Sequence, residues 1–88
     1  MLIVVYESQF KKDLKRAVKQ NKNLNKLLEI IEALQHEKPL PPKSKNHKLK
    51  GTYIGYWECH VEPDWLLVYK LMPEKLILSR IASHSELF

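Results

Sequence analysis

The chain carries a set of side chains that could exchange protons and hold a negatively charged group. Three are histidines outside the predicted helices, two are carboxylates that lie close together around the segment ECHVEPD, and one is an arginine. An unperturbed imidazole has a pKa of about 6.5, so at neutral pH it can accept or donate a proton. Cleavage of RNA by its own ribose 2′-hydroxyl needs a base, an acid and positive charge beside the phosphorus, without a metal or cofactor. The candidate catalytic residues are His47, Glu58, His60, Asp64, Arg80 and His84.

Four further residues near these groups are candidates for holding RNA. Trp65 and Phe88 could stack on the bases of a single strand, and Lys48 and Lys50 place positive charge beside the first histidine. Other readings exist, because an isolated tryptophan in a strand more often belongs to the core, and Asp64 could simply accept bonds from turn amides.

Arg80 is unusual because it interrupts the apolar run LILSRIA in a chain of thirteen lysines and only two arginines. A half-buried guanidinium needs an anionic partner. The sequence leaves two partners open: an ion pair with Glu58, or a bidentate contact with a phosphate.

The spacing argues against a cysteine nucleophile and against a metal centre. Cys59 and His60 are adjacent in a predicted strand, so their side chains should point to opposite faces. Glu58, Cys59, His60 and Asp64 match none of the standard zinc spacings. With two glycines in the chain there is no phosphate-binding glycine loop. We therefore expect no bound metal and no cofactor.

These side chains need a scaffold, and the hydrophobic pattern predicts one of mixed type. Residues 1–7 are apolar without alternation, as in a strand buried on both faces, and Ser8 could cap a helix that follows. Asn23 could cap a second helix, and three prolines between 38 and 46 end the helical region. The apolar stripes of the two helices consist of Phe10, Leu14, Ala17 and Val18, and of Leu24, Leu27, Leu28, Ile31 and Leu34.

Strands are predicted at roughly 47–50, 53–61, 64–71 and 75–81. The fold class is therefore α+β: an N-terminal strand, a helical hairpin, then antiparallel strands forming one twisted sheet with both helices packed on one face. The period of two puts Glu58 and His60 on one face, and the hairpin turn should place Asp64 and Trp65 beside them. Anchoring of the tail by Leu87 and Phe88 would bring His84 close to the end of the strand that carries Arg80.

Length and composition indicate one domain spanning residues 1–88. No apolar run approaches the ~20 residues of a membrane span, there is no signal peptide, and a single cysteine suits a reducing compartment, so we expect a cytoplasmic protein without a membrane partner. The net charge of +5 favours polyanionic partners, either nucleic acid or an acidic protein.

The strings NHKLKGTYIGYWECHVEPDWLLVYKL and RIASHSELF resemble the YafQ branch of the RelE/ParE toxin superfamily, and the similarity covers almost the whole chain. In that branch three motifs hold the active site: His-x-Leu-x-Gly, His-Val-x-Pro-Asp-Trp and Arg-x-x-x-His-x-x-Leu-Phe. Here they fall on His47, on His60, Asp64 and Trp65, and on Arg80, His84 and Phe88.

The resemblance implies a bacterial toxin that cleaves mRNA, typically in the ribosomal A site, and that a cognate antitoxin neutralises. Our hypothesis is a metal-independent nuclease in which His84 is the general acid, Asp64 or His60 is the base, and Arg80 and His47 stabilise the phosphate. Glu58 would orient Arg80 or His60. Two rival functions remain: a non-catalytic ParE-type inhibitor of DNA gyrase, and a nucleic-acid-binding module without catalysis.

Overall fold

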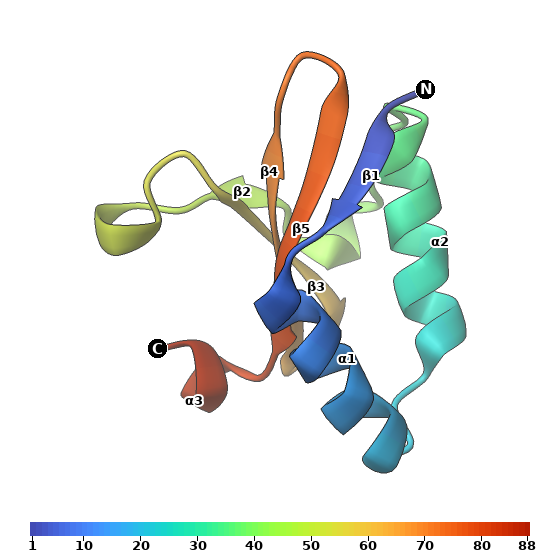
Figure 1. The fold of residues 1–88 in the computed structure, drawn as a ribbon, viewed down its shortest axis with the longest axis vertical. Helices are drawn as coiled ribbons and strands as arrows, with labels where there is room; N and C mark the ends of the chain where they lie inside the picture. Colours follow the sequence, from blue (N-terminus) through green and yellow to red (C-terminus); the bar gives the residue numbers. More distant parts are fainter.

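One twisted sheet of five strands holds the candidate residues, and two long helices cover one of its faces (Figure 1). The structure is a computed structural model that describes residues 1–88. Its elements in chain order are β1 (Ile3–Tyr6), α1 (Ser8–Lys19), α2 (Leu24–Gln35), the 3-10 helix η1 (Pro42–Ser44), β2 (His47–Lys48), the 3-10 helix η2 (Gly51–Tyr53), β3 (Trp57–Glu62), β4 (Trp65–Leu71), β5 (Lys75–Ala82) and α3 (His84–Leu87).

The strands lie in the order β1-β5-β4-β3-β2, with β1 parallel to β5 and every other pair antiparallel. The predicted α+β class, with both long helices on one face of the sheet, is confirmed. The N-terminal strand does lie beside a late strand. The pairing itself came only from the structure.

The face under α1 and α2 forms the main core, which joins residues of both helices to alternate residues of the strands. The second predicted helix cap is confirmed, because the Asn23 side chain accepts a hydrogen bond from the Lys26 amide. The first is wrong: Glu7 occupies the cap position and its carbonyl accepts from the Lys11 amide, so Ser8 is already helical. No side chain caps α1.

The opposite face carries a smaller apolar cluster of Leu66, Val68, Ala82 and Leu87. Leu66 and Val68 alternate along β4 with the main-core residues Leu67 and Tyr69, as the period of two requires. Leu87 comes from α3, which lies across the sheet from α2 in Figure 1. We call this the open face, and it is the face on which most of the candidate catalytic residues gather.

Two local expectations were wrong. Strand β1 is not buried on both faces, since Ile3 is 62% exposed at the edge of the sheet. Strand β3 begins at Trp57 and not at 53, because Gly51 and Gly55 have positive φ and residues 51–53 form a 3-10 turn. The C-terminal tail is a helix, capped by Ser83 and Glu86 in a capping box. None of the helices has the length and hydropathy needed to cross a bilayer.

Candidate active site

The imidazole rings of His60 and His84 meet on the open face, with their centroids 5.6 Å apart. His60 comes from β3, where its register partner is Leu66 of the smaller apolar cluster, and His84 is the first residue of α3. Anchoring of α3 by the buried side chain of Leu87 holds the second ring above the sheet. The expectation that the tail folds back to bring His84 toward the strands is met in the structure.

Each of these rings is held through its Nδ1 atom. His60 Nδ1 lies 3.3 Å from the Pro63 carbonyl oxygen, and His84 Nδ1 lies 2.9 Å from Asp64 Oδ1. Because a carbonyl or carboxylate oxygen only accepts, both Nδ1 atoms carry a proton in these contacts. Both Nε2 atoms are then left to accept a proton in the neutral ring or to donate one in the charged ring.

Asp64 lies in the β3–β4 turn and accepts hydrogen bonds from the first residue of α3. Its Oδ1 accepts both from His84 Nδ1 and, at 3.0 Å, from the His84 amide. These two hydrogen bonds, first that of the amide and then that of the ring, lower the pKa of the Asp64 carboxyl below its usual range. Asp64 is therefore a carboxylate at neutral pH and a poor proton acceptor, and its contacts orient His84.

His47 and Glu58 form a second pair, on neighbouring strands that the β2–β3 register places opposite each other. His47 Nε2 lies 3.0 Å from Glu58 Oε2, while His47 Nδ1 donates to the Lys45 carbonyl at 2.7 Å. Both ring nitrogens face acceptors, so the pair fits an imidazolium beside a carboxylate. Glu58 is buried and its Oε1 has no partner. The expectation that Glu58 orients Arg80 or His60 is wrong, because its partner is His47.

Arg80 shares a row of the sheet with that pair, since it is in register with Val68, which is in register with Glu58. The ion pair between Arg80 and Glu58 that the sequence suggested does not form, because Glu58 pairs with His47. The anionic partner of Arg80 is Asp13 of α1, which accepts from Arg80 Nε at 2.7 Å. That hydrogen bond, with smaller contributions from the Asp13 and Tyr53 charges, raises the pKa of the guanidinium although burial opposes it.

The aromatic residues divide between the two faces. Phe88 is 65% exposed on the open face, where its ring lies edge-on to Tyr53 at 5.8 Å. Trp65 does not fit the predicted stacking role, because it is 2% exposed and belongs to the main core under the helices. Its position in β4 alternates with Leu66, so it points away from the histidines.

The two candidate lysines, Lys48 and Lys50, lie in different surroundings. Lys48 is in register with Trp57, and its ammonium lies 5.5 Å from the centre of that ring, on the face opposite His47. It is therefore not beside the histidines, contrary to expectation. Lys50 is exposed immediately before η2.

Two contributors were missed from the sequence. Tyr53 contacts Phe88 and influences Arg80, but its place depends on the η2 turn, which no sequence signal indicated. Asp13 did leave a signal: it lies between Phe10 and Ala17 at the helical spacing of the buried stripe of α1. A carboxylate at such a position needs a charged partner, and the chain offers few arginines.

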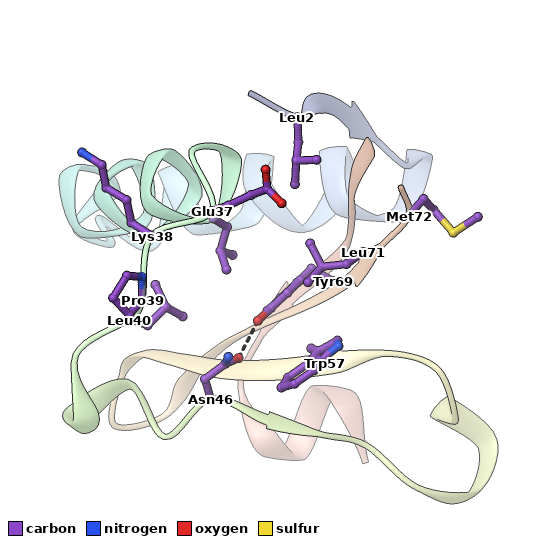
Figure 2. A pocket seen from close by; sticks show the side chains of 11 residues that line it. Leu2, Glu37, Lys38, Pro39, Leu40, Asn46, Trp57, Tyr69, Leu71 and Met72 are labelled. Carbon is purple, nitrogen blue, oxygen red and sulfur yellow. Dashed lines mark hydrogen bonds between the residues drawn. The ribbon is translucent and has the colours of Figure 1, made fainter. Parts of the chain in front are cut away.

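Two hollows border this site, one with His60 in its lining and the other with Asp64. A cavity of about 270 Å³ lies between the end of α2 and strands β3 and β4, with Trp57 stacked on Tyr69 and the Tyr69 hydroxyl donating to Asn46 (Figure 2). None of the six candidate catalytic residues lines it. No three His, Cys, Asp or Glu side chains in the chain are grouped closely enough to hold a metal ion.

The chain was compared with known proteins. Residues 2–88 match the family model described as bacterial toxin of type II toxin-antitoxin system, YafQ. The mRNA interferase toxin YafQ of Escherichia coli K12 is 42% identical over 86 residues, which cover 97% of this chain and 94% of that protein.

Two solved structures are similar over their full length. Crystalline YafQ from E. coli BL21(DE3) superposes with a TM-score of 0.94 at 39% identity, covering 100% of this chain and 99% of that one. A copper-bound mutant toxin from Helicobacter pylori gives a TM-score of 0.96 at 39% identity, with both chains covered completely. A third structure, the E. coli DinJ-YafQ toxin-antitoxin complex, gives a TM-score of 0.91 at 41% identity, covering 99% of this chain and 97% of that one.

Proposed function

The chain belongs to the YafQ family of toxins from type II toxin–antitoxin systems, and we propose that it is an endoribonuclease that cleaves mRNA. The observation that carries the chemistry is the pair of imidazoles of His60 and His84, 5.6 Å apart, each fixed through Nδ1 with Nε2 left for proton transfer. Two such groups are what internal attack by a 2′-hydroxyl requires.

In the proposed reaction the 2′-oxygen bonds to the adjacent phosphorus while the bond from phosphorus to the 5′-oxygen breaks. His60 Nε2 takes the proton of the 2′-hydroxyl, and His84 Nε2 gives a proton to the departing 5′-oxygen. The products are a 2′,3′-cyclic phosphate and a 5′-hydroxyl. Asp64 is the counter-charge of protonated His84 and is less suited to be the base, because the hydrogen bonds from His84 lower its pKa.

Positive charge for the phosphorane comes from Arg80 and from His47 in its pair with Glu58. Arg80 uses Nε and Nη2 to bind Asp13, which leaves three of its five N–H donors for a phosphate. Phe88 offers a ring on which a base can stack, and the exposed Lys50 adds positive charge just before η2, whose Tyr53 contacts Phe88.

The E. coli relative has been crystallised with the antitoxin DinJ, so we propose that a cognate antitoxin binds and neutralises this chain. We also propose that it acts in the bacterial cytoplasm on mRNA held by the ribosome. Mapping transcript ends after brief induction, and repeating cleavage with and without purified ribosomes, tests the ribosome's role. Intact transcripts with damaged DNA would instead favour the gyrase-inhibiting alternative.

The central test compares variants on a short RNA and identifies the ends produced. His60→Ala and His84→Ala should each lower the cleavage rate by about 10² to 10⁴-fold, as the loss of a general base or acid does. His36→Ala removes an exposed histidine at the end of α2 and should leave the rate unchanged. A substrate with 2′-deoxyribose at the cleaved position should be inert. Full activity of either the His60 or the His84 variant would refute the assignment.

Metal independence is part of the proposal, and the copper-bound H. pylori toxin makes it worth testing directly. The donors on the open face do not form a group that fits a metal ion, and the steps above pass through side chains alone. Cleavage should be the same in excess EDTA as in buffer. Loss of cleavage in EDTA that added copper restores would overturn this part.

A further inference from the structure

Asp13 is the most completely buried carboxylate of the chain, 1% exposed on the inner stripe of α1. A carboxylate in such a place is costly unless it is fully hydrogen-bonded. Four donors from α1 and β5 satisfy it, and these are Gln9, Arg16, Arg80 and the amide of Ile81.

Asp13 holds the Arg80 guanidinium through two hydrogen bonds. Nε donates to Oδ2 at 2.7 Å, and Nη2 lies 3.3 Å from Oδ1. Only a guanidinium can make this forked contact, which explains why this position holds arginine in a chain otherwise rich in lysine. Burial would raise the pKa of Asp13, but the bonds from Arg80, Ile81 and Gln9 outweigh it and lower that pKa.

The backbone contact shows why α1 can hold Asp13 in place. Strand β1 pairs with β5 only as far as Leu78, so the edge of β5 beyond that residue has no neighbouring strand. Asp13 Oδ2 accepts from the Ile81 amide at 3.1 Å on that open edge. The Asp13 carboxylate thus accepts a backbone hydrogen bond where β5 has no neighbouring strand. This contact fixes the position of the carboxylate relative to the sheet.

A second arginine extends the network to the helix that carries His84. Arg16 binds Asp13 Oδ1 through Nη2 at 2.8 Å and binds Glu86 of α3 through Nη1. Glu86 also accepts from the Ser83 amide at 2.9 Å as part of the capping box that starts α3. Both arginines of the chain therefore meet at one carboxylate.

We propose that Asp13 is a positioning residue of the nuclease: it aims the Arg80 guanidinium at the scissile phosphate, and through Arg16 it ties α1 to the helix bearing His84. This inference rests on the proposed function. Asp13 itself does not touch RNA.

A double-mutant cycle tests it, with cleavage of a short RNA by wild type, Asp13→Asn, Arg80→Met and the double variant. Asp13→Asn should lower kcat by about 10- to 100-fold with KM little changed, because a misplaced group costs rate even when binding survives. In the Arg80→Met background the same change should cost clearly less than in wild type, because only the contact through Arg16 to α3 is then lost. Equal losses in the two backgrounds would overturn the proposal, since Asp13 would then act on stability alone.

If Asp13→Asn does not fold, Asp13→Glu replaces it in the cycle, because it keeps the charge and moves it by one methylene. Gln9→Ala is the matched control: it removes another contact to Asp13 without touching Arg80 and should leave kcat within about twofold of wild type. A loss in Gln9→Ala as large as that in Asp13→Asn would also contradict the proposal.

A readout independent of activity is the exchange of the arginine Nε–H protons, measured by NMR. With two arginines the spectrum is simple, and the Arg80 signal should be protected from solvent in wild type and lose that protection in Asp13→Asn. An unprotected signal in wild type would refute the positioning role. Wild-type protein that cleaves neither free RNA nor mRNA on purified ribosomes would instead refute the proposed function, while the NMR result would still decide whether Asp13 holds Arg80.

Discussion

The pair of His47 and Glu58 predicts an asymmetry between its two partners. The Glu58 side chain is 6% exposed and the His47 side chain 49% exposed, so water reaches the imidazole and not the carboxylate. Removal of His47 leaves a buried carboxylate whose Oε1 already lacks a partner and whose Oε2 would lose its own. Removal of the charge on Glu58 leaves a His47 ring that is half exposed and can hydrogen-bond with water.

The magnitudes follow from the cost of an unsatisfied buried group. His47→Ala should destabilise the fold by about 2 kcal/mol, within the range of about 1–3 kcal/mol for such a loss. In a domain of this size each kcal/mol shifts Tm by about 4–8 °C, so a loss of about 10 °C is expected. Glu58→Gln keeps the shape and can donate its amide to His47 Nε2, so its cost should stay below about 1 kcal/mol.

Thermal unfolding followed by circular dichroism at neutral pH measures both variants. His36→Ala is the control for the loss of an exposed histidine and should unfold within about 4 °C of wild type, because surface changes rarely exceed about 0.5 kcal/mol. Two outcomes would refute the reasoning: a His47 variant as stable as wild type, or a Glu58→Gln variant that unfolds as early as the His47 variant.

Three other predictions concern single residues. Burial raises the pKa of Cys59 to about 12, so a thiol reagent at pH 8 should label the protein only after it is denatured. Phe88→Ala should weaken RNA binding by about 5- to 150-fold in a filter assay, the cost of one stacked base, whereas Trp65→Phe should leave affinity intact and lower only Tm. The pKa of Asp13 is lowered from its ordinary value of 3.8, so the ionised carboxylate stabilises the fold above pH 3.8. This stabilisation is lost as the pH falls through the folded-state pKa. Asp13→Asn should therefore flatten the curve of unfolding free energy against pH below pH 3.8.

Local interactions made much of the fold readable from the chain. The apolar stripes of both helices, the Asn23 cap and the proline-rich break depend on residues close in sequence, and the structure agrees with them except at Val18 and Leu28, whose side chains are exposed. The start of β3 was predicted too early in the chain, because the η2 turn uses positive φ at Gly51 and Gly55 within a run of aromatic and β-branched residues. The parallel pair of β1 and β5 joins segments about 70 residues apart, and no local pattern encodes such a contact.

The amino-acid sequence by itself determined which chemistry was available: the imidazoles, the guanidinium, and the placement of Glu58 and His60 on one face through the period of two. Only the tertiary structure decided the partners. In the structure Glu58 pairs with His47, Arg80 with Asp13 and Asp64 with His84, and the Trp65 side chain is buried in the core. The physical reason is that an ion pair or hydrogen bond forms only within about 3 Å, a distance set by strand register and helix packing.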